Sequence, residues 1–511
     1  MSDETFENAV RLLNSLPSNA VARQRALSAD KSWCRGTLAL FSNTMTHLGY
    51  PAARLNHLNI IHIAGSKGKG STAALTASIL SQFLSDGRAP TKIGIFASPH
   101  VRTIRERIQI IEGEVTETSD WKVSESQFAT YFFQVWKKVQ ELLQSGILEE
   151  LPYFFRCLLA VAIHAFVCEG VDTVILECGI GGEFDATNFI DRPIVSAITM
   201  LELEHVEILG NDLTSIAWHK SGIMRAGAPA FTIPQRHEAL AELQRRAAEK
   251  GTRLLVVDPP ASPEHMDKSG CLGVNAALAR QLALYTLAKL RGGSWVTNGD
   301  IERKVQRGIF QQPLPGRFET RQIGTSAWYI DGAHTLQSLE KAAKWFSACI
   351  KGKRSDARIL LFNQEARDTK PMLSVLHREL CQRHGHHGDK AGPGFTHVLM
   401  ASNAPFHANT FGPEARSMTQ KCATNGKRKD YQQENAMIWA SLCDDANQSV
   451  LTYPTVREAV EYVREELLMK DYEVQCFATG SMHLVGGLEA VLDELAKDPS
   501  VRINIPEGEA S

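Results

Sequence analysis

The segment His62–Thr72, HIAGSKGKGST, constrains the fold of this chain more than any other feature. It joins an apolar run that predicts a β-strand, LNIIHIA (58–64), to a run that predicts a helix, STAALTASILSQFL (71–84). Three glycines between them let backbone N–H groups face inward and approach an anion closely, and the helix start adds its positive end. A strand, a glycine-rich turn and a helix in this order predict a site for nucleotide phosphates.

Within this loop, Lys69 is expected to reach the β- and γ-phosphates, and a hydroxyl of Ser71 or Thr72 to ligate Mg²⁺. The common phosphate loop has Gly-Lys directly before Ser or Thr, whereas Gly70 intervenes here, so the loop is a variant. The alternative is an ordinary glycine-rich turn with exposed lysines, and the flanking strand and helix favour the phosphate site. The nucleotide-binding residues predicted from this loop are Gly65, Gly68, Lys69, Gly70, Ser71 and Thr72.

Other apolar runs in the first three hundred residues predict further buried strands, at 91–97, 171–177 and 194–199. A long apolar helix is expected at 152–168. Strands that are apolar on both faces and are separated by helices indicate a mostly parallel sheet covered on both sides.

A second alternating series follows the proline- and glycine-containing segment QQPLPGRFE, 311–319, which we interpret as a domain junction. It contains the strand-like runs WYIDG, RILLFN, HVLMAS and VQCFATG and a helix near 336–350. The chain of 511 residues is too long for one ordinary domain, so we expect two α/β domains, at 1–312 and 313–511.

Composition narrows the class of protein. A formal net charge of −2 provides no basic field for nucleic acid, and 43% hydrophobic with 22% charged residues is typical of a globular protein. The ten cysteines form no CxxC pair, which favours a reducing compartment. The start of the chain predicts an amphipathic helix without signal-peptide character, and no apolar stretch reaches membrane-spanning length. We therefore expect a cytoplasmic protein with no membrane span and no nucleic-acid partner.

Three side chains outside the loop are candidates for the same site. Glu177 ends a predicted strand, where a carboxylate points into the ligand crevice of a parallel sheet, although a capping acid is the better interpretation of it alone. His205 follows another strand end and would by itself be structural or exposed. Lys220 lies on an apolar helical stripe, so it is either a buried amine with a depressed pKa, open to carbamylation by CO₂, or a side chain that snorkels to solvent.

A histidine- and glycine-rich segment, RHGHHGDKAGPG at 383–394, is interpreted as a solvated insertion. The alternative is a metal site, but no acidic or cysteine ligand set accompanies the histidines.

Taken in order, these motifs resemble those of the folylpolyglutamate synthases of the Mur-ligase superfamily, especially the eukaryotic branch. The matching segments lie between about residues 58 and 488 and are HIAGSKGKGST, GIFASPHVRTIRERIQI, PYFFRCLL, ILECGIGGEFDATN, IAWHKSGI, LPGRFE, YIDGAHT, LLFN and ATGSMHLVGG. The resemblance implies a P-loop-type ATP-binding domain at 1–312 and a smaller Rossmann-like glutamate-ligase domain at 313–511.

The resemblance also implies a reaction. ATP phosphorylates the γ-carboxylate of a tetrahydrofolate (poly)glutamate, and the amine of L-glutamate attacks the acyl phosphate. The expected partners are therefore folate, L-glutamate and ATP, with two Mg²⁺ ions and a monovalent cation such as K⁺. The chain is expected to be a cytoplasmic monomer, and a mitochondrial form would require an alternative start.

Site residues follow from the same resemblance. Ser71 and Glu177 match ligands of one Mg²⁺, and Glu177, His205 and a carbamylated Lys220 match the set around a second, with Lys69, Lys220 and His205 as the catalytic residues. Further matches are Asn275, Arg317, Asp331 and His334 for the nucleotide, bound across a closing hinge at 311–316, and Ser98, Pro99, His100 and Arg105 for the acid substrate.

This chain departs from the family pattern at several positions. Glu204 and Val206 replace the usual Asp and Thr around His205, His219 replaces Glu or Gln, and the His-Gln pair before Asn275 is missing. The alternative enzyme is thus a paralogue that joins an amino acid to a non-folate acid. A bifunctional dihydrofolate synthase and a nucleotide-binding regulator without turnover are less favoured, the latter because Lys69 and Lys220 are retained.

Overall fold

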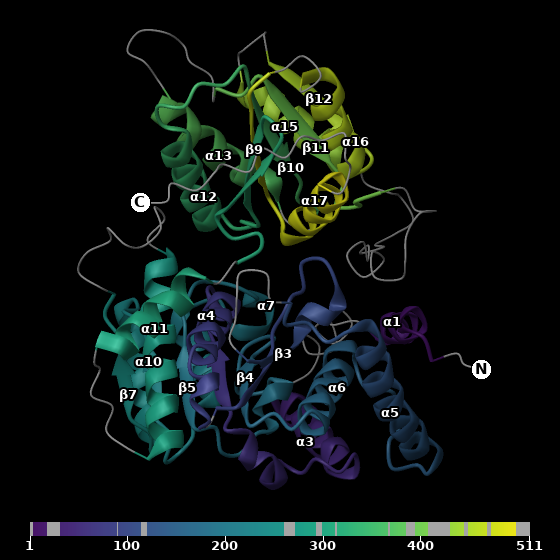
Figure 1. The fold of residues 1–511 in the computed structure, drawn as a ribbon, viewed down its shortest axis with the longest axis vertical. Helices are drawn as coiled ribbons and strands as arrows, with labels where there is room; N and C mark the ends of the chain where they lie inside the picture. The colour runs from purple at the N-terminus through teal and green to yellow at the C-terminus, as the bar shows by residue number, and fades with distance from the viewer. Residues whose placement is uncertain are drawn as a thin grey trace. The chain divides into compact units, whose positions relative to one another are not determined.

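A computed structural model defines the fold. It describes residues 4–17, 31–88, 90–113, 120–259, 271–292, 299–311, 314–365, 368–384, 394–406, 430–443, 448–467 and 472–496. The chain divides into two compact units, Met1–Pro313 and Leu314–Ser511. Each unit is built around one sheet (Figure 1).

The first unit contains a seven-stranded sheet with the order β3-β2-β4-β1-β5-β6-β7. Only the edge pair β2–β3 is antiparallel. The strands are β1 (Ile61–Ala64), β2 (Lys92–Phe96), β3 (Ile108–Glu112), β4 (Thr173–Glu177), β5 (Val195–Ile198), β6 (Ala230–Thr232) and β7 (Leu254–Val256).

Helices cover both faces of this sheet, because its central strands are apolar on both sides. In β4, Val174 and Leu176 belong to one buried cluster, whereas Ile175 between them belongs to another. The first cluster includes α1 (Phe6–Ser15), α3 (Lys31–His47), α5 (Glu125–Gln144) and α6 (Phe154–Cys168), and the second includes α4 (Lys69–Ser81), α10 (Cys271–Arg291) and α11 (Gly299–Phe310). A third cluster lies under α7 (Val206–Leu209), α8 (Leu213–Lys220) and α9 (His237–Glu249).

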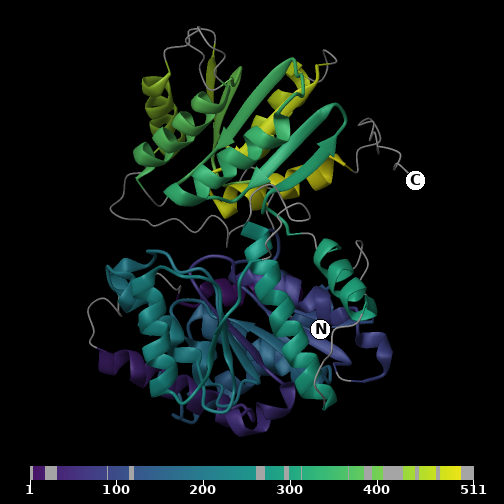
Figure 2. The same cartoon turned by 90° about the vertical axis from the view of Figure 1, so that its left-hand side faces the viewer.

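The second unit contains a six-stranded sheet with the order β12-β11-β10-β13-β9-β8, in which only β8–β9 is antiparallel. The strands are β8 (Glu319–Ile323), β9 (Ser326–Asp331), β10 (Ala357–Phe362), β11 (His397–Ala401), β12 (Ser449–Tyr453) and β13 (Val474–Thr479). The helices α12 (Leu336–Ile350), α13 (Thr369–His384) and α15 (Tyr431–Leu442) pack on one face, while α16 (Val456–Tyr462) and α17 (Met482–Leu495) lie on the other (Figures 1 and 2).

These two mostly parallel sheets confirm the predicted α/β fold class. The predicted strand at 171–177 corresponds to β4, the predicted helix at 152–168 to α6, and the predicted helix at 336–350 to α12, which a Thr335–Ser338 capping box begins. The histidine-rich segment lies mostly outside the described residues.

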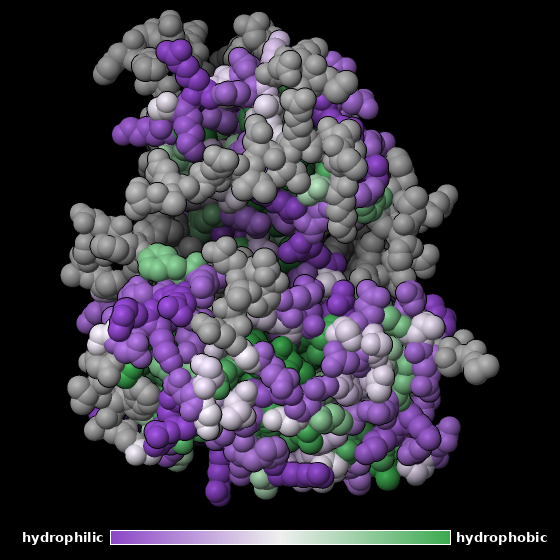
Figure 3. All heavy atoms as spheres, viewed as in Figure 1, coloured by the Kyte–Doolittle hydropathy of each residue, from purple (hydrophilic) through white to green (hydrophobic). Residues whose placement is uncertain are grey.

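The surface of the described residues is mainly hydrophilic on the face shown in Figure 3. No helix in the described part of the chain is both long and apolar enough to cross a membrane.

Candidate active site

The phosphate loop lies between β1 and α4. Gly65 has a φ of +149° and Gly68, the residue before α4, has a φ of +88°. A Cβ on Gly65 would lie 1.8 Å from the Thr199 hydroxyl oxygen, and one on Gly68 would lie 2.3 Å from Asn275 Oδ1. Both positions therefore require glycine, and Asn275 of α10 lies directly against the loop.

Two lysines converge on one backbone oxygen of the loop. Lys69 Nζ donates to the Gly65 carbonyl at 2.8 Å and, more weakly, to that of Ser66 at 3.5 Å. Lys220 Nζ donates to the same Gly65 carbonyl at 2.8 Å. The sequence places these ammonium groups 151 positions apart, and the fold gathers them where phosphates are expected.

The ammonium group of Lys220 is buried, with 1% of the side chain exposed, and donates to Glu204 Oε1 at 2.7 Å. Burial lowers the pKa of Lys220, although Glu204 opposes the shift. Burial alone would raise the pKa of Glu204, but the neighbouring Lys220 and Lys69 ammonium groups hold it below its ordinary value. Of the two interpretations of Lys220, the structure therefore shows the buried amine and not the side chain that snorkels to solvent.

Glu177 is the last residue of β4 and points to the phosphate loop. Its Oε2 accepts a hydrogen bond from Ser98 N at 3.0 Å and lies 3.5 Å from the position that a Cβ on Gly70 would take. A carboxylate at this place, beside the loop that carries Ser71, provides the hard oxygen ligands that Mg²⁺ prefers. These residues therefore fit a magnesium ion.

Thr72 is the second hydroxyl-bearing residue of the loop and lies in the first turn of α4. Thr72 is fully buried, and its Oγ1 has no hydrogen-bond partner among the described residues. A buried hydroxyl without a partner is uncommon in proteins, and this one lies in the first turn of α4, next to the phosphate loop.

His205 adopts an unusual backbone conformation just before α7, with a φ of +45°. A non-glycine residue in this region is sterically strained, and such residues cluster at functional sites. Its Nδ1 lies 4.0 Å from Glu207 Oε1. Within the described ranges, no three His, Cys, Asp or Glu side chains gather closely enough to hold a metal ion. The set of Glu177, His205 and Lys220 around a second ion stays a prediction.

The loop after β2 carries the residues predicted to bind the acid substrate. Ser98 and Pro99 are joined by a cis peptide bond, and His100, which is 8% exposed, follows. Arg107 Nε donates to His100 Nδ1 at 2.9 Å. Burial lowers the pKa of Arg107 to about 10, against the opposing influence of Glu177 and Glu106.

Arg105 points to a different part of the unit. Its Nη1 donates to the Val123 carbonyl at 3.2 Å, and its Nη2 lies 3.5 Å from Glu125 Oε1. Arg107 rather than Arg105 is therefore the cation beside His100. Arg105 and Arg107 lie in the 3₁₀ helix Ile104–Arg107, which begins with a capping box formed by Thr103 and Glu106. The T-x-x-E pattern of these two residues is the sequence signal for this helix.

In the second unit, the predicted nucleotide contacts lie together at the carboxyl end of β9. Asp331 accepts hydrogen bonds from Phe318 N at 3.0 Å and Ala333 N at 2.9 Å. Arg317 Nη1 lies 3.0 Å from the position of a Cβ on Gly332, and His334 Nδ1 contacts the Gly332 carbonyl at 2.8 Å. The edge formed by strand carboxyl ends is where open α/β sheets bind ligands.

Two further polar residues, which were not predicted as site residues, lie at this edge. Asn363 follows β10 and Thr479 ends β13; both are fully buried. Asn363 Oδ1 and Thr479 Oγ1 have no hydrogen-bond partner among the described residues. A polar residue directly after a buried strand, as in LLFN, was the available signal.

Comparisons with known proteins identify relatives of nearly full length. No protein-family model matches the chain. A probable folylpolyglutamate synthase of Schizosaccharomyces pombe is 36% identical over 498 residues, covering 96% of this chain and 95% of the relative. The folylpolyglutamate synthase of Neurospora crassa is 34% identical over 518 residues, covering 96% and 92%.

Solved structures share the fold. The Mycobacterium tuberculosis folylpolyglutamate synthase complexed with ADP and AMPPCP superimposes with a TM-score of 0.65 at 21% identity, covering 96% of this chain and 98% of that one. The apo form of L. casei FPGS gives a TM-score of 0.65 at 19% identity, covering 96% and 99%.

Proposed function

We propose a catalytic cycle for this chain on the premise that it belongs to the folylpolyglutamate synthase family. It is an ATP-dependent ligase that adds L-glutamate to the γ-carboxylate of tetrahydrofolate (poly)glutamates. The observation that carries the cycle is the convergence of Lys69 and Lys220 on the Gly65 carbonyl, beside Glu177.

The first step is phosphoryl transfer to the acid. A γ-carboxylate oxygen of the folate attacks the γ-phosphorus of ATP, the bond to the bridging oxygen breaks, and ADP leaves. Both reactants are anions, so the step depends on positioning and charge neutralisation. We propose that Lys69 exchanges the Gly65 carbonyl for the β- and γ-phosphates.

The second step forms the amide. The amine of L-glutamate, after losing a proton, attacks the acyl carbon, and inorganic phosphate leaves with one oxygen that came from the carboxylate. Ser98, Pro99 and His100 are proposed to position the acid, with Arg107 as the nearby cation. Arg105 supports the same loop through Val123 and Glu125.

Ser71 and Glu177 are proposed to hold one Mg²⁺, and Glu177, His205 and a carbamylated Lys220 a second. When bound, Mg²⁺ supplies charge neutralisation on the phosphoryl oxygens. If the carbamate is used, Lys220→Ala is inactive and a small carboxylate such as acetate restores part of the activity; failure of every small carboxylate would argue against it.

The nucleotide is proposed to contact Gly65, Gly68, Gly70 and Thr72 of the loop, and Asn275 beside it. Arg317, Asp331 and His334 are the proposed nucleotide contacts of the second unit. We also propose that the enzyme requires a monovalent cation such as K⁺ and acts as a monomer. Its proposed location is the cytoplasm, and an alternative start would give a mitochondrial form.

Isotope transfer tests the acyl phosphate directly. With ¹⁸O in the γ-carboxylate of the folate substrate, one ¹⁸O atom per turnover is expected in the released phosphate, measured by mass spectrometry. Phosphate without ¹⁸O would contradict an acyl-phosphate route.

Substitution of the loop lysine tests where the phosphates bind. Lys69→Ala is expected to abolish ligation, because it removes the ammonium group proposed to neutralise the β- and γ-phosphates. The matched control is Lys122→Ala, which removes a lysine paired with Asp120 at the surface of the same unit. Ligation by Lys69→Ala near the parent rate would show that the phosphate site is elsewhere.

A further inference from the structure

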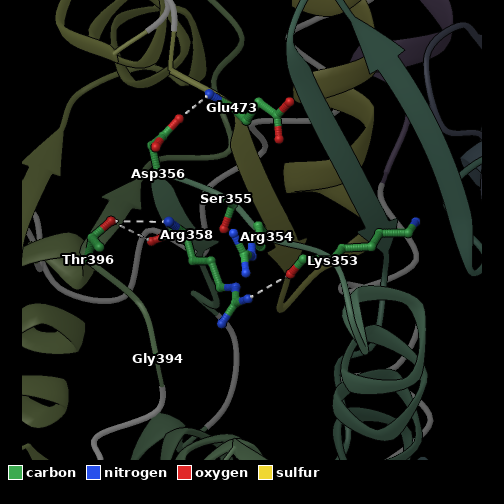
Figure 4. Close-up of a pocket in the computed structure, with 8 residues that line it drawn as sticks. All are labelled: Lys353, Arg354, Ser355, Asp356, Arg358, Gly394, Thr396 and Glu473. Atoms are coloured by element: carbon green, nitrogen blue, oxygen red, sulfur yellow. Dashed lines mark hydrogen bonds between the residues drawn. The ribbon is translucent and has the colours of Figure 1, made fainter.

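A polar cavity lies in the Leu314–Ser511 unit, at the edge of the sheet opposite to Asp331. It has a volume of about 450 Å³ and is lined by Lys353, Arg354, Ser355, Asp356, Arg358, Gly394, Thr396 and Glu473 (Figure 4). These residues lie at or just before the amino ends of β10, β11 and β13. Since β10 has six residues at about 3.3 Å each, the cavity is roughly 20 Å from the carboxyl edge. It is therefore separate from the proposed nucleotide contacts of this unit.

Arg358 is the central cation of this cavity, and its side chain is only partly exposed. Its Nε donates to Gln475 Oε1 at 2.9 Å and its Nη2 to the Lys353 carbonyl at 3.4 Å, which are both neutral acceptors. Among the described residues it forms no ion pair with a carboxylate. Burial lowers the pKa of Arg358, opposed only by Tyr329. A partly desolvated guanidinium group without a counter-ion is unfavourable unless an anion compensates it.

Arg354 and Ser355 add further hydrogen-bond donors. Neither side chain has a hydrogen-bond or ion-pair partner within the described part of the chain, and both line the same cavity. The Lys353 ammonium group, in contrast, points away from the cavity in Figure 4 and lies 3.4 Å from the Tyr329 hydroxyl. The donors facing the cavity are therefore the two arginines and one serine.

The two acidic residues of the lining do not neutralise these arginines. Asp356 Oδ2 accepts a hydrogen bond from Glu473 N at 2.8 Å, which directs it to the loop before β13. Neither Asp356 nor Glu473 forms an ion pair with Arg354 or Arg358 in the described structure. The two guanidinium groups thus keep N–H donors for a ligand.

We propose that this cavity is a binding site for a small oxyanion, of the phosphate or carboxylate class, held by Arg354, Arg358 and Ser355. Guanidinium groups present several N–H donors in a fixed plane, which matches the geometry of both anions. An anion also replaces the water lost from Arg358.

The test uses the full chain with Mg²⁺ and a non-hydrolysable ATP analogue, so that the phosphate loop is already occupied. Inorganic phosphate and L-glutamate are titrated separately, with binding measured by calorimetry and by hydrogen-exchange protection of the 351–358 segment. One phosphate per chain is expected, with protection of that segment. Binding of L-glutamate at this segment instead assigns the site to the carboxylate class and supports the proposal equally.

Substitutions in and near the cavity test which side chains bind the anion. Arg358→Gln should weaken binding by about tenfold or more, as expected for loss of a charge-assisted hydrogen bond. Glu473→Gln, which removes a nearby negative charge, should strengthen it. Lys351→Gln, an exposed lysine that does not line the cavity, should leave it unchanged. Arg354→Gln, at an exposed position, replaces Arg358→Gln if that protein fails to fold.

Equal affinity for the parent, Arg358→Gln and Arg354→Gln would overturn the proposal, because bound phosphate would then be an adventitious ion only. The absence of binding by either anion at tens of millimolar would overturn it as well.

Discussion

Replacing Glu204 by glutamine tests the buried ion pair beneath the phosphate loop. Glu204 Oε1 lies 2.7 Å from Lys220 Nζ, and the two side chains are 14% and 1% exposed. Glutamine keeps the shape and one acceptor oxygen but removes the negative charge. Lys220 would then be buried against only the Gly65 carbonyl and the glutamine oxygen, with Lys69 donating to that same carbonyl.

The magnitude follows from the geometry. Breaking a buried ion pair by removing one partner costs about 3–5 kcal/mol, because the other charge stays uncompensated. The glutamine oxygen still accepts a hydrogen bond from a charged donor, which is worth about 1.5 kcal/mol or more. We therefore expect Glu204→Gln to lower the free energy of unfolding by about 1.5–3.5 kcal/mol.

Urea unfolding provides the assay, with hydrogen exchange of the segment around Lys220 to localise the effect to the first unit. Hydrogen exchange is needed because a chain of two units need not unfold in one step. The control is Glu207→Gln, whose carboxylate is 43% exposed and 4.0 Å from His205, with an expected change below about 0.5 kcal/mol. If Glu204→Gln changes the free energy of unfolding no more than Glu207→Gln does, the argument for a charged, buried Lys220 is refuted.

Three further predictions concern acid stability, the phosphate loop and the acid-binding loop. Burial, with a contribution from Arg225, lowers the pKa of His62 to about 3. Because an unfolded histidine has its ordinary pKa of 6.5, unfolding takes up a proton below that pH. The free energy of unfolding therefore decreases as the pH falls from 6.5 to about 3. In urea titrations, His62→Gln should show a shallower decrease than the parent protein; an equal decrease would refute this. Gly65→Ala should weaken ATP binding at least tenfold by equilibrium dialysis, because its Cβ would meet the Thr199 hydroxyl; unchanged affinity would refute this. Arg107→Met should raise the KM for the folate more than Arg105→Met does, because Arg107 is the cation beside His100; equal effects would refute this assignment.

The sequence was sufficient to predict the central strands, because they are apolar on both faces. The ends of these strands were predicted less accurately. The strand β1 begins at Ile61 and not at Leu58, because residues 52–58 form a 3₁₀ helix and Asn59 adopts a left-handed conformation. The antiparallel edge strand β3 was not predicted, because Ile108–Glu112 is short and mixes apolar with polar residues. An edge strand needs only one neighbour, so its sequence carries a weaker pattern.

The apolar helical stripe was predicted from the spacing of Leu213, Ile216, Ala217, Lys220 and Met224. All five residues are buried, which decides between the two interpretations of Lys220. The helix ends at Lys220, so Met224 packs beyond a 3₁₀ turn rather than on the same helix. The pairing of Lys220 with Glu204 was not predictable. Glu204 precedes His205, whose left-handed backbone conformation no local sequence pattern encodes.

Glutamate ligation itself is the most direct test of the central claim. Purified protein is incubated with ATP, Mg²⁺, tetrahydrofolate and labelled L-glutamate, and the folate products are separated by chain length. The account predicts one added γ-linked glutamate for each ADP and phosphate released. Failure to label tetrahydrofolate, with extension of a different carboxylic acid under the same conditions, would contradict it.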